Sequence, residues 1–212
     1  MLKIEDESAF IASLKSGDEK AFAELVDRHH AGLMRMAMIF VSTRAAAEEL
    51  VQETWVSVIR GIDRFERRSS LKTWIFAIMT NKAKKRAGKD ARTVNLSSFD
   101  EHDIERMFDP DEGRFTARNS WQNPPSAWKI NPEERVQRNE LLEVIARTVE
   151  TLPPKQKLVF TMRDVQGIDV SDISECLEIT DSYQRVLLHR ARATIRAAIE
   201  SYLGERGGAK PC

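Results

Sequence analysis

Apolar residues in the first ninety positions recur every three or four residues, the spacing of amphipathic helices, and no stretch of useful length alternates like a β-strand. The stripes predict helices over residues 19–41, 43–63 and 70–89. Asp18 and Thr43 are placed to cap the first two, because a side-chain oxygen before a helix accepts hydrogen bonds from its free N–H groups. Residues 1–89 are therefore expected to form a compact helical domain.

The helical spacing is lost between residues 90 and 131. This segment contains an acidic run, residues 97–112, and a stretch rich in Trp and Pro, residues 121–128. A loop of about forty residues is too long for the interior of one compact domain. We expect an interdomain linker here.

Helical spacing returns in residues 132–212, which are predicted to form a second domain. Asn131 as N-cap and Pro132 in the first turn give a strong helix start, and Thr180 is placed to cap the last helix. The short connection before Thr180 has the length expected of a helix-turn-helix. The predicted helices cover residues 132–152, 155–166, 169–177 and 180–203.

Charge is segregated along the chain, although its 212 residues include 33 basic and 33 acidic ones. Residues 60–92 hold eleven basic and three acidic residues, and residues 182–210 hold six and two. The acidic run between them, residues 97–112, has seven acidic residues and one basic. This order favours two polyanion-binding lobes joined by a linker that avoids DNA, although each run alone is also typical of a solvated helix face.

Several functional classes are disfavoured by the sequence. The acidic N-terminus lacks the apolar core of a signal peptide, and the longest apolar run, residues 36–41, is far shorter than a bilayer span. Cys176 and Cys212 form no disulfide framework, and the four histidines are scattered without metal-ligand spacing. No catalytic motif is present. We expect a soluble cytoplasmic protein that is not an enzyme, inserts in no membrane and needs no cofactor.

The last predicted helix has a basic face opposite an apolar one. Arg185, His189, Arg192 and Arg196 fall on the basic face, at helical spacing. Directly after a helix-turn-helix, such a stripe is typical of a DNA recognition helix, whose cations meet phosphates and base edges. The plainer alternative is a solvated amphipathic helix.

The third predicted helix carries a basic face formed by Asn81, Lys84 and Lys85. Cations and aromatic rings lie close to it in the sequence: Phe65, Arg67, Lys72 and Trp74. This combination suits a single nucleic-acid strand, because cations follow the phosphates and rings stack on unpaired bases. The alternative for Trp74 is a core position.

The second predicted helix has an acidic face that includes Glu49, Gln52, Glu53 and Val56. Such a face suits a basic partner surface, although acidic helix faces are often simply solvated.

Two blocks of sequence resemble the conserved regions of a known family. Residues 48–55, 63–65 and 70–78 are similar to region 2 of bacterial sigma factors, and residues 151–160 with 189–192 are similar to region 4. The chain therefore resembles a small sigma factor of the extracytoplasmic-function (ECF) group. The resemblance implies an all-α protein made of two small helical domains, the second with a helix-turn-helix.

The resemblance also implies partners and contact residues. Region 2 is expected to bind the clamp helices of the RNA polymerase β′ subunit and the melted -10 strand, and region 4 the β flap and the -35 element. An anti-sigma factor is the expected regulator. The implied polymerase-binding residues are Glu49, Leu50, Gln52 and Glu53. The -10 contacts that the resemblance implies are Phe65, Asn81, Lys84 and Lys85, and the basic and aromatic pattern adds Arg67, Lys72 and Trp74 to the predicted set. The -35 contacts that the resemblance implies are Asp181, Ser182 and Arg185, and the basic stripe of the last helix adds His189 and Arg192.

The chain departs from the family pattern at three positions of the second domain and in the length of its linker. Glu178 stands where the turn usually has Gly, Gln184 takes a normally apolar position, and Leu187 replaces a basic residue. These changes affect which -35 bases are read.

Two other hypotheses compete with a sigma factor. A one-component regulator would sense a ligand with its first domain, but that does not explain the basic and aromatic patch there. An interaction module, such as a scaffold, would leave the basic stripe of the last helix unexplained.

Overall fold

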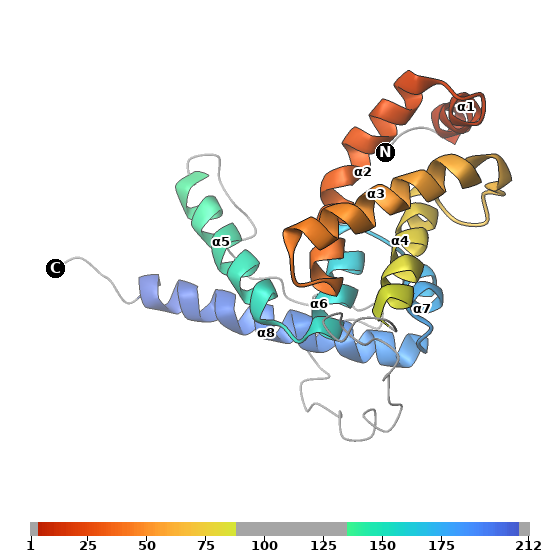
Figure 1. The fold of residues 1–212 in the computed structure, drawn as a ribbon. Coiled ribbons are helices and arrows are strands. Elements are labelled where there is room, and N and C mark those ends of the chain that lie inside the picture. The colour runs from red at the N-terminus through yellow and green to blue at the C-terminus, as the bar shows by residue number, and fades with distance from the viewer. Residues whose placement is uncertain (1–3, 88–134, 208–212) are drawn as a thin grey trace. The chain divides into compact units, whose positions relative to one another are not determined.

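The computed structural model of the chain describes residues 4–87 and 135–207, and all regular secondary structure within these ranges is helical (Figure 1). Contacts divide the chain into two compact units, the first built on helices α1 to α4 and the second on α5, α6 and α8. The predicted all-α class with two helical domains is confirmed. The predicted linker, residues 90–131, and the predicted cap Asn131 lie outside the described residues.

The helices of the first unit begin close to where the sequence predicts. Asp18 accepts a hydrogen bond from the Lys20 amide at 2.9 Å, and the Thr43 hydroxyl accepts one from the Ala46 amide at 3.2 Å. Both predicted caps are confirmed. The elements are α1 (Ile4–Lys15), α2 (Glu19–Phe40), α3 (Arg44–Gly61), the 3-10 turn η1 (Ile62–Arg64) and α4 (Leu71–Ala87). Helix α1 was not predicted.

The core of the first unit lies where α2, α3 and α4 pack against one another. Helix α1 contacts α2 and adds Ile11 and Leu14 to the buried side chains. The large side chains that fill the core are Leu25, Leu33, Met36, Phe40, Leu50, Val58, Ile75, Phe76 and Met79.

The described residues 135–207 contain α5 (Arg135–Thr151), α6 (Pro154–Phe160), the π-helical turn η6 (Thr161–Val165), α7 (Val170–Leu177) and α8 (Asp181–Gly207). The predicted helix over residues 155–166 is thus an α-helix that widens into a π turn, with the Gln166 amide bonded to the Thr161 carbonyl at 2.9 Å. The Thr180 hydroxyl accepts a hydrogen bond from the Tyr183 amide at 3.2 Å, so this predicted cap is confirmed as well.

Helix α8 organises the second unit, because it is long enough to pack on both α5 and α6. Near the C-terminal end of α8, the Tyr202 hydroxyl lies 2.6 Å from a carboxylate oxygen of Glu140 on α5. At the near end, α7, a turn at Glu178 and the start of α8 form the predicted helix-turn-helix. The core beside α5 includes Leu141, Leu152, Ala191, Ile195 and Ile199.

Candidate nucleic-acid and polymerase interfaces

The acidic face of α3 is open to solvent and also carries apolar side chains. Glu49 and Gln52 are exposed, and Glu53 is half-buried. Val56 is 45% exposed and Ile59 56% exposed. Ile59 was not predicted on this face, although its spacing from Gln52 and Val56 places it there. Exposed apolar groups beside charges are typical of a protein-binding surface.

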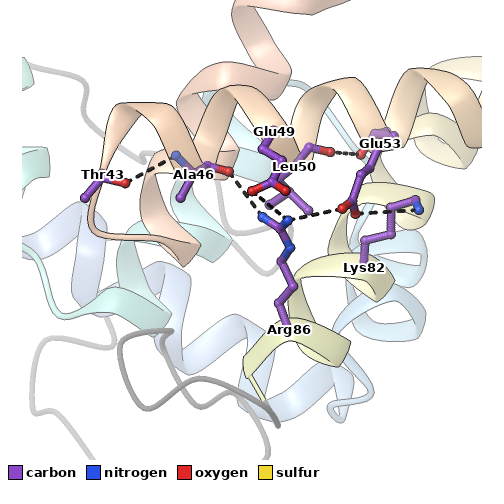
Figure 2. A network of polar contacts seen from close by, with 8 residues as sticks. Thr43, Ala46, Glu49, Leu50, Glu53, Lys82 and Arg86 are labelled. Carbon is purple, nitrogen blue, oxygen red and sulfur yellow. Dashed lines mark hydrogen bonds and ion pairs between the residues drawn. The ribbon is translucent and has the colours of Figure 1, made fainter.

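The carboxylates of this face are held by the basic end of α4 (Figure 2). An Arg86 guanidinium nitrogen lies 2.9 Å from Glu49 Oε2 and 3.1 Å from Glu53 Oε1, and Lys82 Nζ lies 3.9 Å from Glu53 Oε2. Arg86 also donates to the Ala46 carbonyl at 3.5 Å. The acidic face is therefore partly neutralised from within the unit, and a basic partner must join or displace Arg86.

Leu50, which the resemblance placed on the polymerase surface, is instead fully buried. Its carbonyl accepts a hydrogen bond from the Thr54 hydroxyl at 2.7 Å, inside the core. The reason is helical geometry: Leu50 falls on the buried side of α3 with Ala47 and Thr54, whereas Glu49 and Gln52 lie on its exposed side. Leu50 supports the surface and does not belong to it.

Four of the predicted -10 residues share one side of α4. At 100° per residue, Trp74, Asn81, Lys84 and Lys85 lie within about a quarter turn of one another. Asn81 and Lys85 are exposed, whereas Trp74 and Lys84 are half-buried. This side of α4, from Trp74 to Lys85, is called the α4 basic face below.

Lys72 lies elsewhere, about half a turn around α4 from Asn81. Burial lowers the pKa of its ammonium group, and the charge of Arg35 on α2 lowers it further. Burial likewise lowers the pKa of His29 to about 4, with the charges of Lys72 and Arg28 acting in the same direction. Lys72 thus belongs to a cationic group packed toward α2, apart from the α4 basic face.

The connection from η1 to α4 holds the other two predicted -10 residues. Phe65 is buried, with its ring centroid 5.0 Å from that of Trp74 and the two rings tilted by 39°. Arg67 has a left-handed backbone, with φ of +59°, and its guanidinium bonds to Ser8. In this conformation Phe65 supports Trp74 from the core side and offers no open ring to a base.

The helix-turn-helix presents the first turn and a half of α8. Asp181, Ser182 and Arg185 are exposed, and His189 is half-buried one turn later. Arg192 is different, since it is buried and bonded to Asp164 of η6 at 2.8 and 2.5 Å. The predicted basic stripe therefore ends before Arg192, whose charge is used inside the unit.

Comparison with known proteins decides the family. The family model described as Sigma-70 region 2 matches residues 25–93. A second family model, described as Sigma-70, region 4, matches residues 142–195. The RNA polymerase sigma-H factor of Pseudomonas aeruginosa is 24% identical over 205 residues, 97% of this chain and 100% of its own. The ECF RNA polymerase sigma-E factor of Escherichia coli is 25% identical over 189 residues, 89% of this chain and 92% of its own. The chain belongs to the ECF group of sigma factors.

Solved structures agree with the fold of this sigma factor. The sigma factor RpoE from Bartonella quintana, solved in complex with the anti-sigma factor NepR, has a TM-score of 0.53 at 19% identity. The match covers 85% of this chain and 98% of that one. Sigma factors recognise promoter DNA for RNA polymerase and are not themselves enzymes.

The three residues at which this sigma factor departs from its family pattern all lie within the described helix-turn-helix. Glu178 adopts the left-handed backbone that Gly usually supplies, with φ of +58°. Gln184 is fully buried, as expected of a normally apolar position, and neither of its amide atoms has a hydrogen-bond partner among the described residues. Leu187 is buried on the apolar side of α8.

Residues 4–87 and 135–207 contain no group of three or more His, Cys, Asp or Glu side chains arranged to hold a metal ion. No helix in the same ranges has the length and apolar character to cross a membrane.

Proposed function

We propose that this sigma factor docks on core RNA polymerase through the acidic face of α3 and reads promoters with two separate surfaces, one on each unit. The observation that carries the proposal is the pattern of exposure. Asn81 and Lys85 on α4, and Asp181, Ser182 and Arg185 on α8, extend into solvent from helices whose other sides are buried. Each unit thus has a polar surface of the right chemistry for nucleic acid.

The polymerase surface combines Glu49, Gln52 and Glu53 with the apolar side chains of Val56 and Ile59. Acidic groups meet the basic side chains of the β′ clamp helices, and the apolar groups add buried area at the centre of the contact. Binding in the cytoplasm, where core polymerase acts, is part of the proposal.

This surface is tested by giving its apolar part a charge. The double variant Val56→Glu, Ile59→Glu is expected to lower affinity for core polymerase at least tenfold in a pull-down titration. Met38→Glu is the matched control, because Met38 on α2 is 44% exposed and lies outside the surface. Normal binding by the double variant, or equal loss in the control, would contradict the assignment.

The first unit is proposed to hold the melted -10 strand along the α4 basic face. Asn81 offers a donor and an acceptor to one exposed base edge, while the exposed Lys85 neutralises a phosphate. Lys84 is left out because its ammonium nitrogen is buried. Trp74, half-buried and supported by Phe65, supplies apolar surface for stacking. Lys72 is left out because it lies on another side of α4.

The second unit is proposed to place the start of α8 in the major groove of the -35 element. Arg185 is suited to a guanine edge, and Asp181 and Ser182 contribute from the first turn. His189, one turn further along, is suited to a phosphate. Arg192 is left out because its guanidinium is bonded to Asp164.

An anti-sigma factor is the proposed regulator, supported by the solved relative that carries one. The pure chain is then expected to start transcription with core polymerase alone, without any small ligand. A requirement for a small ligand would favour the one-component hypothesis instead.

The decisive experiment for the whole proposal is transcription from a randomised promoter library by reconstituted holoenzyme. Two blocks of preferred sequence are expected, near -10 and -35. Arg185→Ala should relax only the -35 block. A holoenzyme that transcribes all library members equally would overturn the proposed function.

A further inference from the structure

Helix α1 contacts both η1 and the connection between η1 and α4. The Lys15 ammonium donates to the Asp63 carbonyl at 3.2 Å and to the Phe65 carbonyl at 2.9 Å. The Arg67 guanidinium donates to the Ser8 hydroxyl at 3.1 Å and to the Ser8 carbonyl at 3.2 Å. We call residues 65–70 the capture loop.

The two contacts come from one side of α1. Ser8 and Lys15 are seven residues apart, which puts them on the same side of a helix and about 10 Å apart along its axis. On the adjoining side, Ile11 and Leu14 are buried. The helix is therefore anchored in the core by one side and presents a polar edge along the capture loop.

The shape of the capture loop depends on these contacts. Arg67 has a φ of +59°, a conformation that residues other than glycine rarely adopt and that persists only when the surroundings impose it. The atoms that hold its side chain belong to Ser8, a residue 59 positions earlier in the chain. At the far end, the Ser70 hydroxyl accepts a hydrogen bond from the Thr73 amide at 3.0 Å.

The same contacts reach the α4 basic face through the aromatic pair. Lys15 fixes the carbonyl of Phe65, and the Phe65 ring packs on Trp74 at 5.0 Å between centroids. Trp74 lies on the same side of α4 as Asn81. A change at Lys15 is thus transmitted through two contacts to the surface proposed to hold the melted strand.

We propose that Ser8 and Lys15 are positioning residues for promoter reading: from α1 they hold the capture loop and Trp74 in the shape that selects a base of the melted strand. This inference rests on the proposed function of the first unit. Neither residue needs to touch DNA, since both act through the backbone or the side chain of the loop.

The test measures base preference with the holoenzyme. Single-stranded oligonucleotides carrying each of the four bases at each -10 position are titrated against holoenzyme made with Ser8→Ala, Lys15→Met or both. At one position the ratio between the best and worst base is expected to fall at least fivefold. Binding to core polymerase and the urea midpoint of the free protein should stay near wild type.

Matched variants separate positioning from loss of charge or of a hydroxyl group. Lys20→Met removes an exposed cation from the start of α2, and Ser16→Ala removes the hydroxyl that bonds locally to the Ser13 carbonyl. Both should keep the wild-type ratio. Lys15→Arg and Ser8→Thr retain the donors and the acceptor, so these variants should keep most of the wild-type ratio between the best and the worst base.

The outcomes distinguish this inference from the proposed function. An unchanged ratio in the double variant, or equal weakening for all four bases, overturns the positioning role while leaving single-strand binding intact. A wild-type holoenzyme with no base preference at any position overturns the proposed function of the first unit, and the positioning role falls with it.

Discussion

The Arg192 guanidinium donates two hydrogen bonds to the Asp164 carboxylate, from Nε to Oδ2 at 2.8 Å and from Nη2 to Oδ1 at 2.5 Å. Arg192 lies on α8 and Asp164 in the π-helical turn that ends α6. The pair therefore ties α8, the second helix of the helix-turn-helix, to the helix before that motif. Because this pair is bidentate and largely buried, it fixes the orientation of α8 relative to the π-helical turn as well as stabilising their contact.

Replacing Arg192 by Ala should lower the free energy of unfolding of the second unit by about 2–3 kcal/mol, because it leaves a carboxylate that is only partly exposed without its counter-charge. Urea unfolding of the full chain measures this. Arg185→Ala is the control, since Arg185 is exposed and its loss should change stability by less than about 0.5 kcal/mol. Similar stability for both variants would mean that the pair contributes little.

Replacing Gln184 by Leu should stabilise the second unit by about 1–2 kcal/mol. The Gln184 side chain is fully buried, and an amide without hydrogen bonds costs free energy that an apolar side chain of similar size does not. Thermal unfolding measures the gain. Gln52→Leu, at an exposed position of α3, should give none. A loss of stability in Gln184→Leu would show that the amide finds partners, such as ordered water.

Glu178→Gly should raise the free energy of unfolding of the second unit by about 1 kcal/mol, because glycine adopts a φ of +58° without the steric strain of other residues. Glu178→Ala keeps that cost and is the informative control. The two variants are compared by urea unfolding. If alanine stabilises as much as glycine, the backbone conformation is not the cause.

His29 should make the first unit sensitive to mild acid. Its pKa is lowered from 6.5 to about 4 in the folded chain, so between these values the unfolded chain binds a proton that the folded chain does not. Stability therefore falls as the pH drops from 6.5 to 4 and shows no further His29 effect below that. His29→Gln should flatten this part of the curve. Urea midpoints at pH 7, 5.5 and 4.5 provide the measurement, and parallel curves for the two proteins would refute it.

Asn81→Ala and Lys85→Ala should have different effects on -10 recognition. Loss of the amide should remove about 1–3 kcal/mol of preference at one base, whereas loss of the cation should weaken all sequences alike and reduce the salt dependence. Holoenzyme titrations with single-stranded -10 variants at two salt concentrations separate the effects. The same uniform loss in both would mean that Asn81 reads no base.

The features predicted correctly from the sequence depend on neighbours within a few residues. The caps Asp18, Thr43 and Thr180 each accept a hydrogen bond from an amide two or three positions later, so local chemistry was sufficient. The same holds for the faces of α3 and α4, which follow from helical spacing alone.

Residues whose partners are distant in sequence were assigned less well. Phe65 is buried in the connection before α4, where no helical stripe applies, and Arg67 is held by Ser8 from an unpredicted helix. Leu50 lies on the buried side of α3, as its spacing from Thr54 indicates, although the family resemblance placed it on the surface. The burial of Arg192 could have been predicted from the helical spacing. Leu188 lies four residues before it and Ile195 three residues after it, and both are buried, so Arg192 falls on the apolar stripe of α8.

The π-helical turn at Thr161–Val165 has a consequence for how the chain tolerates changes in length. An i to i+5 hydrogen bond between the Thr161 carbonyl and the Gln166 amide is equivalent to one residue inserted into an α-helix. Deleting one residue before Asp164 in this turn would restore the regular helix but rotate the Asp164 side chain by about 100° around the axis, away from Arg192. Many substitutions in this segment leave Asp164 facing Arg192, whereas a single-residue deletion turns it away. Related sequences should therefore vary here in composition but keep the number of residues constant.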